Sequence, residues 1–222
     1  LPDLPFRHAL AALHVTLGAN HVLPLRLGEP MRIASVVRRT RSSFEAVTAS
    51  SVALRSADIL AMGVLGLVLG PVAFGALLGV WGAAVLAVVG AIGVAGVLWL
   101  RRTRSRVSDR IRMPGPVVAL GSITAWLLEA VLVWESARFA GIDLSFHHAV
   151  LVTTAAVTAQ TVAVSPGGIG TYEAASVAAY ASLGHDSGAA LTAAITAHAL
   201  KTAYSLVAGG IAVFVPRPGL LG

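Results

Sequence analysis

One stretch decides the fold of this chain: Val164-Ser165-Pro166-Gly167-Gly168-Ile169-Gly170-Thr171-Tyr172-Glu173. It places a proline, three glycines and a carboxylate in a region that is otherwise apolar enough to lie in a membrane. In lipid, every backbone donor and acceptor must be satisfied by the protein itself, so irregular backbone persists only where protein packs around it or where it lines a polar cavity. The stretch therefore predicts a broken helix at a functional site.

The composition of the whole chain is that of an integral membrane protein. Of the 222 residues, 56% are hydrophobic and 12% are charged, which is too apolar for one soluble domain. No charged residue occurs between Asp58 and Arg101, and at about 20 residues per span this run suffices for two membrane helices. The predicted fold class is therefore all-α: a polytopic helical bundle with broken or re-entrant half-helices.

Apolar runs and helix breakers give the predicted elements. Full spans are expected at residues 43–69, 76–100, 116–140 and 187–215. The shorter runs at 149–164 and 171–183 flank the break and are expected to form a re-entrant pair or two half-helices. Residues 4–17 are too short and too polar for a lone span, so we expect a partial helix or the end of a longer one.

These elements are expected to form a single membrane domain over residues 1–222. The chain opens with Leu1-Pro2-Asp3, without a methionine and without the pattern of a signal peptide. We therefore expect the domain to be incomplete at its N-terminus, and the number of spans is a minimum.

Two clusters of arginine predict the orientation in the membrane. They lie in loops 26–41 and 101–112, and arginine-rich loops beside apolar spans face the cytoplasm. The C-terminus, with Arg217, falls on the same side. We interpret the net charge of +6 as a topology signal rather than as nucleic-acid binding, because no aromatic and basic module accompanies it.

Several chemistries lack their sequence signatures. The chain has no cysteine, which excludes disulfides and thiol catalysis. His8, His14 and His21 do not have an established metal-ligand spacing, and no protease, hydrolase or P-loop motif occurs. We therefore expect no enzyme activity, no metal and no cofactor.

A stretch earlier in the chain resembles the break at residues 166–173. Residues 24–29 and 166–173 both begin Pro-x-x-x-Gly and end on an acidic residue. By the charge-derived orientation, the helix after the first break (24–29) starts on the cytoplasmic side of the membrane, and the helix after the second break (166–173) starts on the outer side. This predicts an inverted-topology repeat, with halves at about 4–69 and 148–215, an arrangement that places a transporter's site at the bilayer midplane. Alanine-rich helices align with one another easily, so chance similarity is the alternative.

Ionisable side chains interrupt the apolar spans. Each costs about 2.5 to 3.5 kcal/mol near the centre of a bilayer and needs a partner or a wet cavity. They are Arg55, Asp58, Glu129, Glu173 and Lys201, with His198 one turn before Lys201. A polar path for a ligand is one interpretation. Alternatively, Arg55 and Asp58 neutralise each other on one helix face, and Lys201 makes a structural bond to Glu129 or Glu173.

The break at residues 166–173 also offers a place for an anion. Glu173 falls in the first turn of the helix after the break, where a carboxylate favours the helix dipole, so capping alone would explain it. The same helix N-terminus, with the amides of Gly167 and Gly168, could accept a phosphate.

Three motifs together resemble one protein family. They are Asn20-His-Val-Leu-Pro24-Leu-Arg26-Leu-Gly28-Glu29-Pro-Met-Arg32, Leu54-Arg55-Ser-Ala-Asp58 and Pro166-Gly167-Gly168-Ile-Gly170-Thr-Tyr-Glu173. In order and spacing they are similar to the flippase-like membrane region of the lysylphosphatidylglycerol synthase family, over most of the chain. That family often has an acidic residue where this chain has Leu54, and tends to have arginine in the last span, where this chain has Lys201.

The resemblance implies a multi-pass protein of the prokaryotic cytoplasmic membrane that handles lipid headgroups. In the best understood members, this region is thought to move aminoacylated phosphatidylglycerol between leaflets, and a separate soluble domain makes that lipid. Because the chain ends at Gly222, soon after its last span, we expect the synthase domain to be absent. The expected ligand is then an anionic phospholipid, an aminoacylated lipid or a polyprenyl-linked lipid.

The expected function is lipid translocation without catalysis. The cations expected to meet an anionic headgroup are Arg55 and Lys201. Three carboxylates would balance these cations or bind a cationic substituent of the headgroup: Asp58, Glu129 and Glu173. The residues expected to form a cytoplasmic gate are Asn20, Arg26, Glu29 and Arg32. Two alternatives stay open: an accessory or scaffold subunit of a membrane lipid- or glycan-modifying enzyme, and an intramembrane lipid transferase. A homo-oligomer or an enzyme partner is compatible with these functions.

Overall fold

The computed structural model describes residues 4–40, 42–69, 115–161 and 163–215, together with the separate positions 91, 94–95, 98 and 102. Its elements are α1 (Phe6–Val22), η1 (Pro24–Arg26), α2 (Gly28–Arg39), α3 (Phe44–Leu69), α5 (Pro116–Phe139), α6 (Phe146–Thr161), η2 (Pro166–Gly168), α7 (Thr171–Ser182) and α8 (Ser187–Val213). Every regular element among the described residues is helical, which confirms the predicted all-α class. The predicted span at 76–100 and the loop at 101–112 lie almost entirely outside the described residues.

Most helix boundaries agree with those predicted from the sequence. The helices predicted at 43–69, 116–140 and 187–215 are α3, α5 and α8, and the two short helices around the break are α6 and α7. The prediction for residues 4–17 was too short, because α1 continues to Val22. Polar residues near its end weaken the apolar pattern, but no helix breaker occurs before Pro24.

Two of the described helices are long and apolar enough to cross a membrane: Phe44–Leu65 within α3, and α5. In α5, only 11% of the apolar window is buried by the rest of the chain. Val117 is 82% exposed and Leu128 is 66% exposed. A long apolar helix that the protein leaves uncovered fits a lipid environment far better than water. α8 is also long, but its polar residues make it less apolar than these two helices.

The described helices form two series of similar design. The first runs α1, η1, α2 and α3, with 17, 3, 12 and 26 residues. The second runs α6, η2, α7 and α8, with 16, 3, 12 and 27 residues. In each series, a medium helix meets a proline, turns through one short 3-10 segment and continues as a short helix followed by a long one.

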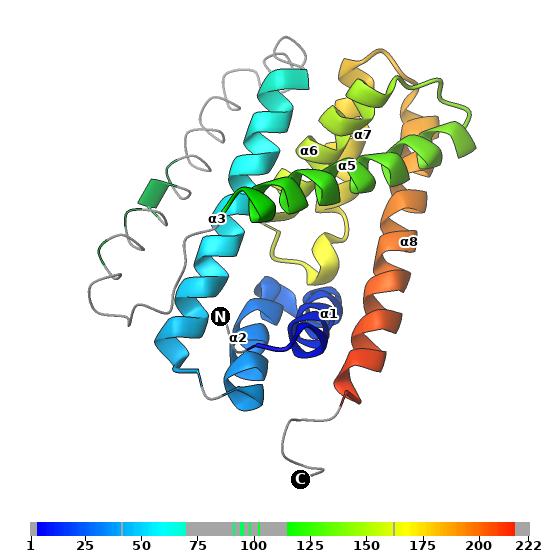
Figure 1. Cartoon of the computed structure of the whole chain (residues 1–222). Coiled ribbons are helices and arrows are strands. Elements are labelled where there is room, and N and C mark those ends of the chain that lie inside the picture. Colours follow the sequence, from blue (N-terminus) through cyan, green and yellow to red (C-terminus); the bar gives the residue numbers. More distant parts are fainter. Residues whose placement is uncertain are drawn as a thin grey trace.

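The two series pack closely against each other (Figure 1). α1 packs against α2 and also along α8, and α5 contacts α3, α6 and α8. The crossing of α1 and α8 is made possible by two glycines, because a Cβ at Gly209 would lie 2.9 Å from the Cα of Gly18 and 2.8 Å from the carbonyl oxygen of His14. Such small residues let membrane helices approach closely.

The two breaks contact each other. η1 contacts η2, and the two segments share an unusual backbone conformation at their second residue. Leu25 has φ 56° and Gly167 has φ 64°. Among the described residues, Leu25 is the one non-glycine with a positive φ. Glycine adopts a positive φ without a conformational penalty, whereas for leucine it costs about 1 to 2 kcal/mol. The surrounding structure must therefore hold Leu25 in this conformation.

Candidate functional site

A connected set of polar side chains surrounds the second break. It is formed by Glu129 on α5, Gln160 on α6, Glu173 on α7, and His198 and Lys201 on α8, all linked around the carbonyl oxygen of Gly167 in η2. We call these residues the η2 cluster. Four helices and the 3-10 segment thus converge on one point, and the break in the helix is what brings a backbone carbonyl there.

Lys201 and Glu129 form the charged end of the η2 cluster. The Lys201 ammonium donates to Oε1 of Glu129 and also, at 3.3 Å, to the side-chain oxygen of Gln160. Each partner of the ion pair is 21% exposed. The Lys201 nitrogen also lies 5.3 Å from the ring centre of Tyr172, a distance at which a cation is attracted to an aromatic face. Of the alternatives for Lys201, the structure therefore has the bond to Glu129.

His198 forms the other end of the η2 cluster. It is nearly fully buried, at 3% exposure, and both ring nitrogens have partners. Nε2 lies 3.1 Å from the Gly167 carbonyl oxygen, and Nδ1 lies 2.5 Å from Oε1 of Glu173. A carbonyl oxygen only accepts, so Nε2 must carry a proton. One further proton then lies between Nδ1 and the carboxyl group, and the pair is neutral as a whole.

Glu173 also has the capping role that its position predicted. Its Oε2 accepts a hydrogen bond of 2.7 Å from the backbone N–H of Gly170, at the start of α7. Both carboxylate oxygens are thus bound within the protein. The N–H of Gly168 donates to the carbonyl oxygen of Ser165, so η2 presents an acceptor, the Gly167 carbonyl, to the cluster. An acceptor attracts donors and cations rather than phosphate oxygens.

Gly168 sets the approach of Gln160. It has φ 78°, and a Cβ there would lie 2.5 Å from Cγ of Gln160. The side-chain amide of Gln160 donates to the Gly167 carbonyl oxygen next door. Only a residue without a side chain fits this position.

Arg55 and Asp58 lie apart from the η2 cluster. Asp58 accepts a hydrogen bond of 2.7 Å from the hydroxyl of Ser122, which joins α3 to α5. Arg55 is half-buried, and within the described part of the chain it makes neither a hydrogen bond nor an ion pair. The intrahelical Arg55–Asp58 pair, one of the alternatives from the sequence, is not formed among these residues.

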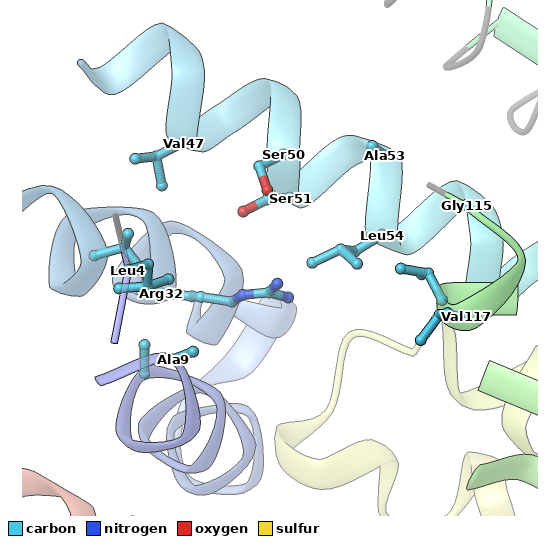
Figure 2. Close-up of a pocket in the computed structure, with 13 residues that line it drawn as sticks. Leu4, Ala9, Arg32, Val47, Ser50, Ser51, Ala53, Leu54, Gly115 and Val117 are labelled. Carbon is cyan, nitrogen blue, oxygen red and sulfur yellow. The ribbon is translucent and has the colours of Figure 1, made fainter. Parts of the chain in front are cut away.

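The predicted gate residues lie at the first break. The side-chain oxygen of Asn20 accepts a hydrogen bond of 2.9 Å from the N–H of Gly28 and so fixes the start of α2. Arg32 faces Glu29 at 3.8 Å and points toward a cavity between the helices of the first series (Figure 2). Arg26 belongs to η1, and its side chain lies outside the described part.

The sequence analysis missed Gln160 and Ser122. Gln160 is 5% exposed and connects Lys201 to the break. A signal for it existed, because it is the one amide side chain in the apolar run 149–164. Ser122 gave no signal, since serine occurs throughout these helices and its contact with Asp58 joins two different helices.

Comparison with known proteins supports the resemblance read from the motifs. The family model of the lysylphosphatidylglycerol synthase TM region matches residues 3–209. No curated protein and no solved structure matches the chain. With its uncovered apolar helices, the chain is a membrane protein with a role connected to membrane lipids, and it belongs to the family of the lysylphosphatidylglycerol synthase TM region.

Proposed function

We propose that this chain is a lipid translocator without catalytic activity, in which the η2 cluster handles the headgroup. The observation that carries the proposal is the connected set of Glu129, Lys201, Gln160, His198 and Glu173 around the Gly167 carbonyl. A protein that needs only a stable bundle gains little from buried ion pairs, because desolvation offsets most of their attraction. Ionisable groups inside a membrane bundle typically mark a path for a substrate or an ion.

The charges of the η2 cluster suit a headgroup of mixed charge. An incoming phosphate would displace the Glu129 carboxylate from the Lys201 ammonium and take its place as counter-charge. Glu129 would then be free to receive a cationic substituent of the headgroup, such as an amino group. Arg55, half-buried and without a partner among the described residues, would supply a second cation on the side of α3.

The route across the membrane rests on an inverted-topology repeat. The two series of equal element order, with proline breaks that contact each other, support this arrangement. Inverted repeats put broken helices and the site near the bilayer midplane, and rocking of one half against the other exposes the site to each side in turn. In this proposal the gate residues Asn20, Arg26, Glu29 and Arg32 close the cytoplasmic side.

The proposed location is the cytoplasmic membrane of a prokaryote, with loops 26–41 and 101–112 and the C-terminus in the cytoplasm. The distribution of arginine in the sequence supports this orientation. Candidate lipids are an anionic phospholipid, an aminoacylated lipid and a polyprenyl-linked lipid. A homo-oligomer is compatible with the proposal.

A second candidate is an accessory subunit of a membrane enzyme that modifies lipids or glycans. One observation favours it: Lys201 and Glu129 already satisfy each other, as they would in a purely structural pair. In that case neutralising the pair together would leave the cellular function intact, and the chain would co-purify with its enzyme.

Reconstitution distinguishes the two. Purified protein in liposomes is expected to move at least one of three labelled lipids between leaflets: phosphatidylglycerol, its lysyl derivative, or a polyprenyl-phosphate-linked sugar. Absence of movement for all three, in vesicles that contain folded protein, would overturn the proposal and favour the accessory subunit.

A further inference from the structure

A second polar site lies in the first series, away from the η2 cluster. A cavity of about 590 Å³ is lined by residues of α1, α2, α3 and the start of α5 (Figure 2). No residue of the η2 cluster lines it. Its volume falls in the range of small-molecule sites, about 300 to 1,000 Å³, and its walls are mostly aliphatic, with Val36, Val47, Leu54 and Val117 among them.

Arg32 is the cation of this cavity. Its side chain is 19% exposed, and its guanidinium group extends from α2 into the space between α2 and α3 (Figure 2). Its nearest acidic group, Oε2 of Glu29, is 3.8 Å away, which is beyond hydrogen-bonding distance. Within the described residues, the five donors of this guanidinium make no hydrogen bond. A planar, half-enclosed group with free donors is suited to a phosphate, which it can bind through two oxygens.

Two hydroxyl groups lie on the opposite wall. Ser50 and Ser51 of α3 both line the cavity (Figure 2). Elsewhere in these helices, hydroxyls such as those of Thr48 and Ser136 donate to the carbonyl four residues earlier. Ser50 and Ser51 make no hydrogen bond among the described residues, although Ser51 is only 8% exposed. Both hydroxyls can therefore donate to an acceptor oxygen that enters the cavity.

The far end of the cavity is apolar and reaches the outside of the protein. Val117 lies there, beyond Leu54 as seen from Arg32 (Figure 2), and it is 82% exposed on the uncovered face of α5. A ligand that fills the cavity therefore needs an acceptor-rich anionic end and an aliphatic end that leads toward lipid.

We propose that this cavity binds a membrane phospholipid, with its phosphate held by Arg32, Ser50 and Ser51 and an acyl chain passing Leu54 and Val117. Binding here does not require that the lipid is moved across the membrane, so it stands apart from translocation by the η2 cluster.

The test is a binding titration of the full chain in detergent by native mass spectrometry. Three probes separate the parts of the ligand: phosphatidylglycerol, diacylglycerol with the same acyl chains but no phosphate, and inorganic phosphate alone. Phosphatidylglycerol is expected to bind at least about tenfold more tightly than either of the others, because each of them lacks one of the two ends that the cavity accommodates.

Three substitutions locate the site. Arg32→Gln is expected to weaken phosphatidylglycerol binding about tenfold, the factor typical of losing hydrogen bonds to a charged group, and Ser51→Ala to weaken it by a smaller factor. Arg138→Gln is the matched control, since Arg138 also faces an acidic residue three positions earlier but is exposed at the end of α5, and its binding should equal that of the wild type. Should Arg32→Gln fail to fold, Ser51→Ala decides.

Two results would overturn the proposal. If Ser51→Ala and folded Arg32→Gln both bind phosphatidylglycerol as tightly as the wild type, the lipid binds somewhere other than this cavity. Equal binding of inorganic phosphate and phosphatidylglycerol would make it a site for a free anion. Neither result depends on whether liposome transport is observed.

Discussion

The backbone N–H of Leu25 donates a hydrogen bond of 3.2 Å to the carbonyl oxygen of Val164. This bond joins the first break to the second, across 139 residues of sequence (164 minus 25). It helps to hold Leu25 in its unusual backbone conformation, with φ 56°. Strain of this kind is retained where the surrounding structure fixes it, often at functional sites.

Leu25 gives the first prediction. Leu25→Gly keeps the N–H and adopts φ 56° freely, so it should leave the protein as stable as the wild type or more stable by about 1 kcal/mol. Leu25→Val should lower the melting temperature in detergent, because a β-branched residue tolerates this region poorly. Leu27→Val, with φ −61° at its position, is the control and should have little effect. Equal losses for Leu25→Val and Leu27→Val would mean that the strain is absent.

The crossing of α1 and α8 gives a second prediction, with a neighbouring glycine as control. Gly209→Ala places a Cβ 2.8 Å from the carbonyl oxygen of His14 and should destabilise the protein by about 1 to 3 kcal/mol, as overpacking does. Gly210→Ala meets nothing within 4 Å and should be neutral or stabilising by up to about 1 kcal/mol, through helix propensity. Thermal unfolding of both variants in one detergent makes the comparison, and a Gly209→Ala protein as stable as Gly210→Ala would contradict the close crossing.

The proton on His198 gives a third prediction. Because Nε2 faces a carbonyl oxygen at 3.1 Å, it should carry a proton whatever the state of Glu173. Nitrogen NMR of histidine-labelled protein measures this directly, and the signals that vanish in His198→Asn identify the residue. Glu173→Gln should change the Nδ1 signal and leave Nε2 protonated. An unprotonated Nε2 in the wild type would exclude the arrangement around Gly167.

The Lys201–Glu129 pair gives a fourth prediction, for stability. Lys201→Met leaves a carboxylate without its cation, and Glu129→Gln leaves an ammonium without its anion. Each change should cost up to about 3 kcal/mol, toward the low end for buried pairs because both side chains are 21% exposed. The double variant should recover most of this loss. Unfolding of the four proteins forms a double-mutant cycle, and strictly additive losses would mean that the two groups do not interact.

The sequence predicted the backbone well because its signals are local. Long, mainly apolar runs indicated α3, α5 and α8, and Pro166 with its glycines indicated the position of η2. α1 was misjudged because apolar character was used as the measure of length, whereas the helix ends where a residue that cannot continue it occurs, at Pro24.

The sequence predicted most residues of the candidate site, but it did not predict which of them bond to each other. Glu129, Glu173 and Lys201 were identified because charge inside an apolar run is costly wherever it lies. Which of them meet depends on helix packing: Lys201 bonds to Glu129, 72 positions away, and Asp58 to Ser122, 64 positions away. The contact of Gly18 with Gly209 is of the same kind, since neither glycine is distinctive within its own helix.

The proposed function is tested most directly by lipid movement in liposomes that contain either Glu129→Gln or Glu135→Gln. Both residues lie on α5, but Glu129 is bonded to Lys201 in the η2 cluster, while Glu135 is 53% exposed and, among the described residues, pairs only with the exposed Arg138. With a lipid that the wild type moves, Glu129→Gln is expected to slow the movement at least about tenfold, equivalent to losing about 1.4 kcal/mol of stabilisation at the barrier, and Glu135→Gln to match the wild type. Equal rates for all three proteins, each folded and equally incorporated, would contradict a role of the η2 cluster in moving lipid.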